Sequence, residues 1–337
     1  MSKKNNNVNK EGKENQEGKA NEVDAENIDK KIIKKRSEIL FLYDIADNNP
    51  NGDPLEENKP RIDRETGINI VTDTRFKRTI RDYLRDYRNQ EIFIREVRKD
   101  DWKLKTKEDR LTDLDIQSKD DLLRACIDVR CFGCTIAIEA KSIKFTGPIQ
   151  FKLGKSLHRV LNKFFKGTTV MPSQEKKMQG TFTEDYKLPY SLIKFYGVIN
   201  ENAAKDTMLS EDDVELLLDG IWNGTKNLMS RSKIGQVPRL LLKINYKEKN
   251  YHIGDLDNYN MMKISSDLPE EEMRDISQIK LDITGLIEKL KNYNSKIENI
   301  EFKVDDQIKF ICQKQEKTFK DCLETVSVPL KIIKVIA

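Results

Sequence analysis

Histidine is scarce in this chain, which has only His158 and His252 among its 337 residues. A serine or cysteine nucleophile needs a neighbouring base, and histidine is the usual one. His158 stands between Leu157 and Arg159 in a basic stretch, where a polar contact fits better than proton transfer. The sequence therefore gives little support to nucleophilic catalysis.

A complete zinc motif is also missing. A structural zinc site takes four ligands, typically from two Cys-x-x-Cys pairs. Cys131 and Cys134 form one such pair with Cys126 nearby, but Cys312 and Cys322 are ten residues apart. If Cys131 and Cys134 lie in a strand, their side chains point to opposite faces. We interpret all five thiols as buried structural residues and expect neither a metal nor a cofactor.

Long apolar runs are absent as well. No segment approaches the ~20 apolar residues of a membrane-spanning helix, and no charged-apolar-small leader opens the chain. The scattered, odd number of cysteines is typical of a reducing compartment. We therefore expect a cytoplasmic protein with no membrane partner. No glycine loop of the Walker or dinucleotide type is present to hold a nucleotide.

The overall composition, 37% hydrophobic and 35% charged, suits a globular core that follows a polar N-terminal tail. Residues 1–35 are rich in Asn, Lys, Glu and Gly and are predicted to be disordered. Residues 36–337 are predicted to form a single domain. Within it, the charged stretch 91–125 and the Gly- and Lys-containing stretch 154–187 read as insertions.

Hydrophobic periodicity predicts an α+β fold with an antiparallel sheet and helices on one face. The expected helices run from Thr72 or Asp73 to about Arg88, and from Ser210 to Met229. The expected strands are 38–45, 128–139, 143–153, 190–199, 239–246, 300–311 and 326–336.

Net charge is only +4, so any case for a nucleic-acid partner depends on where the cations lie. Three basic strips stand out, and no acidic run neutralises them locally. They are a helix face with Arg75, Lys77, Arg78, Arg81, Arg85 and Arg88; a strip with Lys152, Lys155, His158, Arg159, Lys163 and Lys166; and a strip with Arg231, Lys233 and Arg239. Strips at the ends of elements favour a protein that binds a phosphate backbone.

The turn after the first strand holds Asp44, Asp47 and Asp53 among asparagines. Asparagine and aspartate suit tight turns, and turn formation is the simple interpretation. Clustered carboxylates can also hold a divalent ion, so metal-dependent RNA cleavage stays open as an alternative.

Several of these motifs together resemble a known family. Asp47-Asn-Asn-Pro-Asn-Gly-Asp-Pro, then Pro60-Arg-Ile-Asp-Arg-Glu-Thr-Gly and Val71-Thr-Asp-Thr-Arg-Phe-Lys-Arg, are similar to the backbone subunit of the subtype I-B CRISPR Cascade complex. The subtype I-C counterpart is nearly as similar. The resemblance continues through Phe145-Thr-Gly-Pro-Ile-Gln-Phe and Arg231-Ser-Lys-Ile-Gly and covers residues 37–246.

This resemblance implies a modified RRM-like (ferredoxin-like) palm, with fingers inserted at about 90–125 and a thumb at 154–187. It implies CRISPR antiviral defence by a non-catalytic subunit that binds guide RNA (crRNA) along its backbone. The implied partners are copies of itself, other Cascade subunits, and a target DNA strand that pairs with the guide.

The resemblance also implies which residues meet the RNA. Those at matching basic or loop positions are Asn51, Arg75, Lys77, Arg78, Arg159, Arg231 and Lys233. Met171 and Phe182 are the expected apolar thumb residues that wedge between bases. Two alternatives stay open, namely a metal-dependent endoribonuclease on the same fold and a general single-stranded RNA-binding protein.

Overall fold

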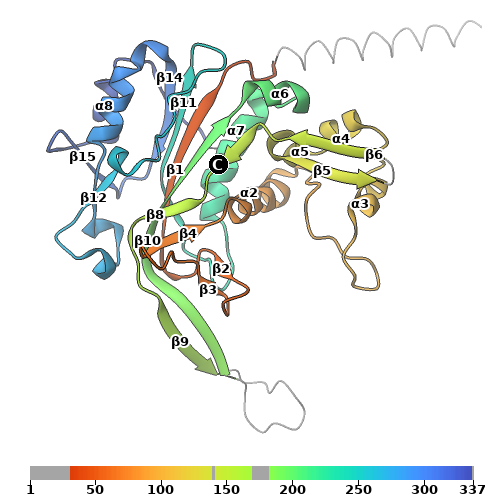
Figure 1. Ribbon diagram of the computed structural model, residues 1–337, viewed down its shortest axis with the longest axis horizontal. Coiled ribbons are helices and arrows are strands. Elements are labelled where there is room, and N and C mark those ends of the chain that lie inside the picture. Colours follow the sequence, from red (N-terminus) through yellow and green to blue (C-terminus); the bar gives the residue numbers. More distant parts are fainter. Residues whose placement is uncertain (1–30, 139–140, 169–181, 336–337) are drawn as a thin grey trace, which may run out of the picture.

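The computed structural model describes residues 31–138, 141–168 and 182–335 (Figure 1). The protein is a mixed α/β structure built on one large sheet whose strand order is β17-β14-β11-β1-β10-β8-β4. The strands β7 and β9 also pair with β10. No helix of the described residues is long and apolar enough to cross a membrane.

The centre of this sheet is β1 (Ser37–Asn48), which confirms the strand expected at 38–45. It pairs antiparallel with β10 (Phe182–Ile199) on one side and with β11 (Val237–Tyr246) on the other. Its first nine residues are all buried. A strand covered on both faces needs this continuous apolar run rather than an alternating pattern.

One face of the sheet is covered by α2 (Asp73–Arg88) and α7 (Glu211–Lys226), as the sequence predicts. The Thr72 side chain caps α2 by accepting a hydrogen bond from Arg75 N at 3.2 Å. Gly224 of α7 lets the two helices approach closely, because a Cβ there would lie 3.0 Å from Tyr83 Cβ. The helix α6 (Glu201–Thr207) precedes α7.

The opposite face is covered too, by a lobe at 251–326, of which the sequence leaves the part up to about 298 without assigned structure. Its small sheet has the order β12-β13-β15-β16. The lobe packs α8 (Thr284–Asn292) and α9 (Phe319–Glu324) into a core shared with β1, β10 and β11. Its strands are β12 (Lys263–Ser265), β13 (Lys280–Asp282), β15 (Lys309–Cys312) and β16 (Gln315–Lys317). Its short 3-10 turns are Tyr259–Met261, Glu270–Glu272 (η2), Ile276–Gln278 and Asn294–Lys296.

The strands observed in and next to this lobe differ from two predicted ones. The segment 300–311 is not one strand, since β14 (Ile297–Val304) joins the large sheet and β15 joins the small one. Among the described residues of the segment 326–336, only β17 (Leu330–Ile332) is a strand, and it runs parallel to β14. In the first segment, apolar residues lie on both sides of the break at Asp305, Asp306 and Gln307, so apolar content alone joins the two strands.

A third core gathers beside α2, at the right of Figure 1. It contains α3 (Lys107–Asp113), α4 (Lys119–Ala125), α5 (Ile127–Phe132) and the hairpin β5 (Gly133–Ile138) with β6 (Lys141–Thr146). The prediction of a strand at 128–139 is therefore wrong in its first half, where α5 is helical. That half is short and apolar, and such a run fits a buried helix turn as well as a strand.

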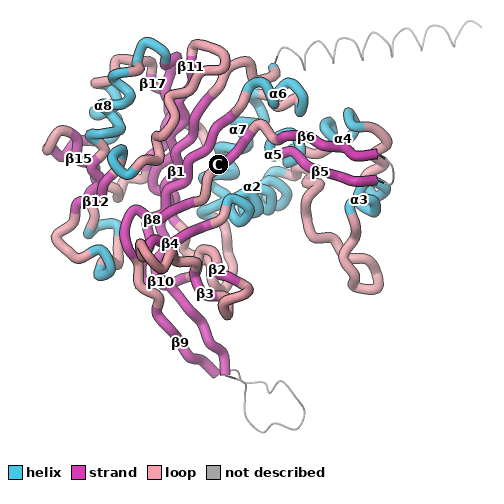
Figure 2. Tube along the Cα trace, in the orientation of Figure 1, coloured by secondary structure: helices cyan, strands magenta, loops and turns pink. Residues whose placement is uncertain are grey.

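The described parts of the segment 154–187 contain strands rather than a structureless excursion, and some of these strands build an arm that leaves the large sheet. After β7 (Ile149–Phe151) and β8 (Gly154–Arg159), the strand β9 (Lys163–Thr168) pairs with the first residues of β10 away from the sheet (Figure 2). The 18 residues of β10 then run on into the sheet, so the strand expected at 190–199 is only its second half. Phe182 opens β10, and Met171 lies outside the described residues.

Candidate nucleic-acid interface

The site begins with a polar turn that joins β1 to α2 through three short strands. These are β2 (Gly52–Asp53), β3 (Lys59–Pro60) and β4 (Ile68–Val71). Asn51 Oδ1 accepts hydrogen bonds from Thr72 N at 2.9 Å and from Thr72 Oγ1 at 3.0 Å. Asn51 therefore fixes the residue that caps α2, and through it the position of Arg75.

A second turn, residues 228–235, packs against the end of β1, where the first turn begins. The end of β1 holds it, because Asn49 N donates to Ser232 O at 2.9 Å and Asn48 Nδ2 donates to Ile234 O at 2.8 Å. Two segments far apart in the sequence thus meet at one end of the sheet. The turn carries Arg231 and Lys233.

Arg75 and Lys233 form the electrostatic centre of the site. Both are half-buried, and neither forms an ion pair with a carboxylate of the described residues. Burial lowers the pKa of Lys233, and the charge of Arg75 lowers it further. Burial also lowers the pKa of Arg75, with Arg78 adding to the effect and Asp82 opposing it. Two uncompensated cations at close range make this spot favourable for an anion.

The hydrogen bonds of these two cations leave donors available. Arg75 Nη2 donates to Thr79 Oγ1 at 3.1 Å, and its Nε has no partner among the described residues. Lys233 Nζ contacts Ser232 Oγ at 3.1 Å. Since a guanidinium has five N–H donors and an ammonium three, the pair retains donors for an incoming oxyanion.

The other predicted RNA-binding residues lie nearby or farther along the surface, and each already has an acidic neighbour. Lys77 pairs with Asp73 at 3.2 Å, and the exposed Arg78 lies 3.6 Å from Asp82. Arg159 pairs with Glu271 and Arg231 with Asp185. These four cations are therefore partly compensated, unlike Arg75 and Lys233.

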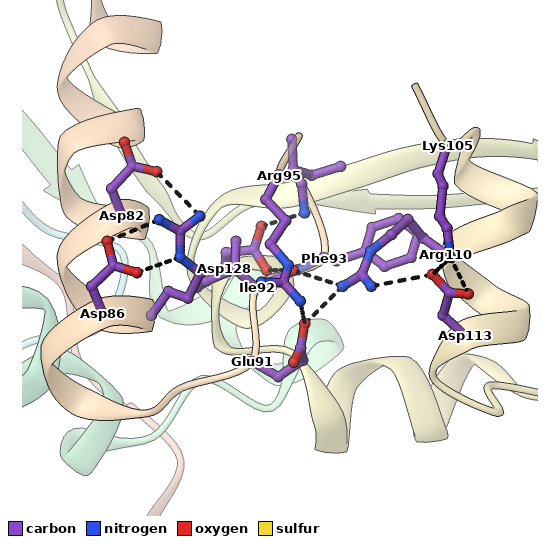
Figure 3. A network of polar contacts seen from close by, with 12 residues as sticks. Asp82, Asp86, Glu91, Ile92, Phe93, Arg95, Lys105, Arg110, Asp113 and Asp128 are labelled. Atoms are coloured by element: carbon purple, nitrogen blue, oxygen red, sulfur yellow. Dashed lines mark hydrogen bonds and ion pairs between the residues drawn. The ribbon is translucent and has the colours of Figure 1, made fainter. Parts of the chain in front are cut away.

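The predicted cationic face of α2 needs correction, because the arginines of its C-terminal half form ion pairs, two of which join the helix to neighbouring elements. Arg81 Nε donates to Asp128 of α5 at 2.9 Å, and Arg88 Nε donates to Asp219 of α7 at 2.6 Å. Arg85 is held by Asp86 and Asp82, and Asp128 also accepts from Phe93 N (Figure 3). The neutralising carboxylates come from distant positions, so a search for nearby acidic runs does not find them.

Two of the three acidic turn residues, Asp44 and Asp53, are likewise engaged in the fold. Asp53 pairs with Arg61 at 2.7 Å and accepts from Leu55 N at 3.0 Å. Asp44 is buried and accepts from Arg239 and Tyr190. Burial raises the pKa of Asp44, while Arg239 opposes that shift. Within the described ranges, no group of three His, Cys, Asp or Glu side chains is arranged to hold a metal ion.

The cysteines are packed in cores. Cys126 lies in the core beside α2, and burial raises its pKa to about 12. Cys131 is in α5 and not in a strand, so the argument that it faces away from Cys134 does not hold. Burial raises the pKa of Cys134 to about 11 and that of Cys131 well above its usual value.

Aromatic residues on the arm were missed in the sequence prediction. Phe164 and Phe165 are 50% and 44% exposed, and the Phe164 ring lies 5.1 Å from that of Tyr186. Lysines cover these rings, with Lys59 Nζ 4.7 Å from the centre of Tyr186. The signal was available as Lys163-Phe-Phe-Lys166, a pattern of aromatics between cations that suits a nucleic-acid strand.

Comparison with known proteins then decides the family. The family model described as CRISPR-associated protein Cas7 matches residues 35–284. The chain belongs to the Cas7 family. A curated relative named CRISPR-associated protein Cas7, from Haloferax volcanii, is 35% identical over an alignment of 297 residues that covers 79% of this chain and 85% of the relative. The resemblance found in the motifs is thereby confirmed at the level of the family.

Two solved structures are also similar to this chain. One is titled CRISPR RNA-guided surveillance complex, pre-nicking, with a TM-score of 0.47 and 10% identity over 87% of this chain and 99% of the other. The second is titled CRISPR RNA-guided surveillance complex, with a TM-score of 0.48 and 12% identity over 87% and 98%.

Proposed function

We propose that this Cas7-family chain is a backbone subunit of a Cascade complex and holds guide RNA by its phosphates. The observation that carries the proposal is the Arg75–Lys233 pair, two half-buried cations without a carboxylate partner among the described residues. A phosphate between them would relieve their repulsion and satisfy their spare donors. Phosphate contacts carry no base sequence, which leaves target recognition to pairing with the guide.

The palm of this proposal is RRM-like. In its support, the strands β11, β1, β10 and β8 lie side by side, each antiparallel to its neighbour, with α2 and α7 on one face. We assign the fingers to the core beside α2 and the thumb to the β9–β10 arm. Asn51, Lys77, Arg78, Arg159 and Arg231 then extend the phosphate-binding surface, and Phe182 lies on the thumb. Copies of the subunit would stack along one guide, which pairs with target DNA.

The test is binding of several unrelated single-stranded RNAs to the full chain at several salt concentrations, by fluorescence anisotropy. We expect Arg75→Gln, Lys233→Ala and Arg78→Ala each to weaken binding of every sequence by a similar factor, about 3- to 10-fold. Each should also reduce the salt slope by about one. Lys249→Ala removes one exposed cation elsewhere and serves as the control. An effect of Lys233→Ala on only some sequences would contradict a backbone-binding role.

We further propose that the subunit does not cut RNA. In support, Asp53 is paired with Arg61 and Asp44 with Arg239, so neither is available to bind a metal ion without breaking an ion pair. Guide-loaded protein should leave a complementary RNA intact after long incubation with Mg²⁺ or Mn²⁺. Cleavage that disappears in Asp47→Ala or Asp53→Ala would instead support the endoribonuclease alternative.

A further inference from the structure

Two arginines of the proposed guide surface are each held by a carboxylate from a different part of the fold. Arg231 donates through Nη2 to Asp185, which lies in the arm portion of β10. Arg159 Nε lies 3.2 Å from Glu271, which belongs to the turn η2 of the lobe. Both arginines remain well exposed, at 71% and 61% of the side chain.

The Arg231–Asp185 contact lies beside the centre of the guide site. Arg231 is two residues from Lys233 in the turn that Asn49 holds against the end of β1. The Asp185 carboxylate therefore approaches the same turn that is to receive a phosphate. A carboxylate and a phosphate both fit the guanidinium fork, and the two compete for the same Nη donor.

Among the described residues, two sets of contacts, here called braces, hold the arm against the rest of the fold, and the Arg231–Asp185 contact is one of them. On one side, Tyr186 OH donates to Glu57 at 3.3 Å, Lys59 covers the Tyr186 ring, and β3 packs against β10. On the other side, Arg231 holds Asp185. Of these two braces, the second uses a residue of the proposed guide surface, so bound RNA would compete for it.

The second carboxylate site is built in a similar way. Glu270 accepts from Arg159 N at 2.7 Å while its neighbour Glu271 meets the guanidinium. Two adjacent acids of η2 thus engage both the main chain and the side chain of Arg159, and they join the lobe to β8. The third acid of this turn, Glu272, is exposed and has no ion pair among the described residues.

We propose that Asp185 and Glu271 are internal substitutes for guide phosphates. In the free subunit they neutralise Arg231 and Arg159, and the guide displaces them, which releases the arm on the Arg231 side. This inference rests on the proposed function. An exposed ion pair is weak enough to be exchanged for a polyanion whose binding releases counterions. Short or isolated anions then bind weakly, and the arm is released only by an RNA strand long enough to contact several of these cations.

The test uses pairs of variants that remove the same charge one residue apart. Asp185→Asn is compared with Glu184→Gln, since Glu184 is exposed, precedes Asp185 on the same strand and has no ion pair among the described residues. Glu271→Gln is compared with Glu272→Gln. We measure binding of the full chain to a 12-nucleotide and a 40-nucleotide single-stranded RNA by fluorescence anisotropy at fixed salt.

We expect Asp185→Asn and Glu271→Gln to tighten binding about 3- to 10-fold, with the larger gain on the short RNA, and their controls to change it less than about 2-fold. The inference is overturned if Asp185→Asn binds no more tightly than Glu184→Gln. Weaker binding by Asp185→Asn overturns it too, because Asp185 would then be orienting Arg231 for the phosphate.

A second measurement follows the arm in the absence of RNA. Chymotrypsin cleavage after Phe164 and Phe165 should be faster in Asp185→Asn than in Glu184→Gln, because one brace is missing. Equal rates would overturn the link to the arm. If wild-type protein binds RNA and loses affinity in Lys233→Ala while Asp185→Asn stays unchanged, only this inference fails. If wild-type protein binds no RNA, the proposed function itself fails.

Discussion

The substitution Asp128→Ala offers a sharp test of how the fold uses its charges. Asp128 is completely buried and accepts three hydrogen bonds, from Arg81 Nε at 2.9 Å, Phe93 N at 2.8 Å and Ile94 N at 3.1 Å. Alanine would leave one guanidinium, only 13% exposed, without its counter-ion and two main-chain N–H groups without their acceptor.

The size of the effect follows from these three losses. Removing one partner of a buried ion pair costs ~3–5 kcal/mol, and an unsatisfied buried N–H group costs ~1–3 kcal/mol. Because Arg81 retains some access to water and the losses overlap, we expect Asp128→Ala to lower the free energy of unfolding by about 4 kcal/mol. Asp128→Asn keeps one carbonyl acceptor and should fall between Asp128→Ala and wild type.

Urea unfolding followed by circular dichroism and tryptophan fluorescence measures this loss. Trp222 lies in α7 and Trp102 near α3, so the two indoles report on different parts of the chain. The control is Asp86→Ala, whose carboxylate is 48% exposed and pairs with Arg85, and which should cost less than about 1 kcal/mol. If Asp128→Ala costs no more than Asp86→Ala, the buried-carboxylate reasoning is wrong.

Three further predictions concern buried charges and thiols. Arg88→Ala leaves the completely buried Asp219 without this guanidinium, and it should lower the free energy of unfolding by about 3 kcal/mol in urea titrations while leaving RNA affinity unchanged. Burial raises the pKa of Cys126 to about 12, so its thiol should resist alkylation at pH 8. Stability should also fall as pH rises above ~8.5, where unfolded thiols lose protons that the folded protein keeps. Burial lowers the pKa of Lys194 to about 8, so Lys194→Met should stabilise the protein below pH 8, by about 2 kcal/mol in calorimetry, and the gain should shrink as pH rises toward 10.5.

Local patterns were sufficient to predict the elements around the proposed guide site. Thr72 and Ser210 cap α2 and α7 as their sequences suggest, and the apolar run in β1 marks a strand covered on both faces. These signals act within one or two turns of chain, so a single sequence contains them in full. The same patterns place Arg75 and Lys233 in basic strips at the ends of elements, whereas their assignment to RNA came from the family resemblance and stays a prediction.

Contacts between distant residues were not predictable. Arg81 meets Asp128 across 47 residues and Arg88 meets Asp219 across 131, so periodicity alone made these arginines look free. The partners of Arg159 and Arg231 lie in the lobe and the arm, and neither segment had a recognisable pattern. The mistaken strand at α5 has a different cause, because its short apolar run fits two kinds of buried element.

The uninterrupted course of β10 restricts how the arm can evolve. The strand pairs with β9 in the arm and with β1 in the large sheet without a turn between them. Because strand side chains alternate faces, one residue inserted near Lys187 would exchange the two faces of the arm, whereas two inserted residues would restore them. Changes in arm length among relatives should therefore come in even steps on this strand, and odd steps should appear only with a compensating bulge.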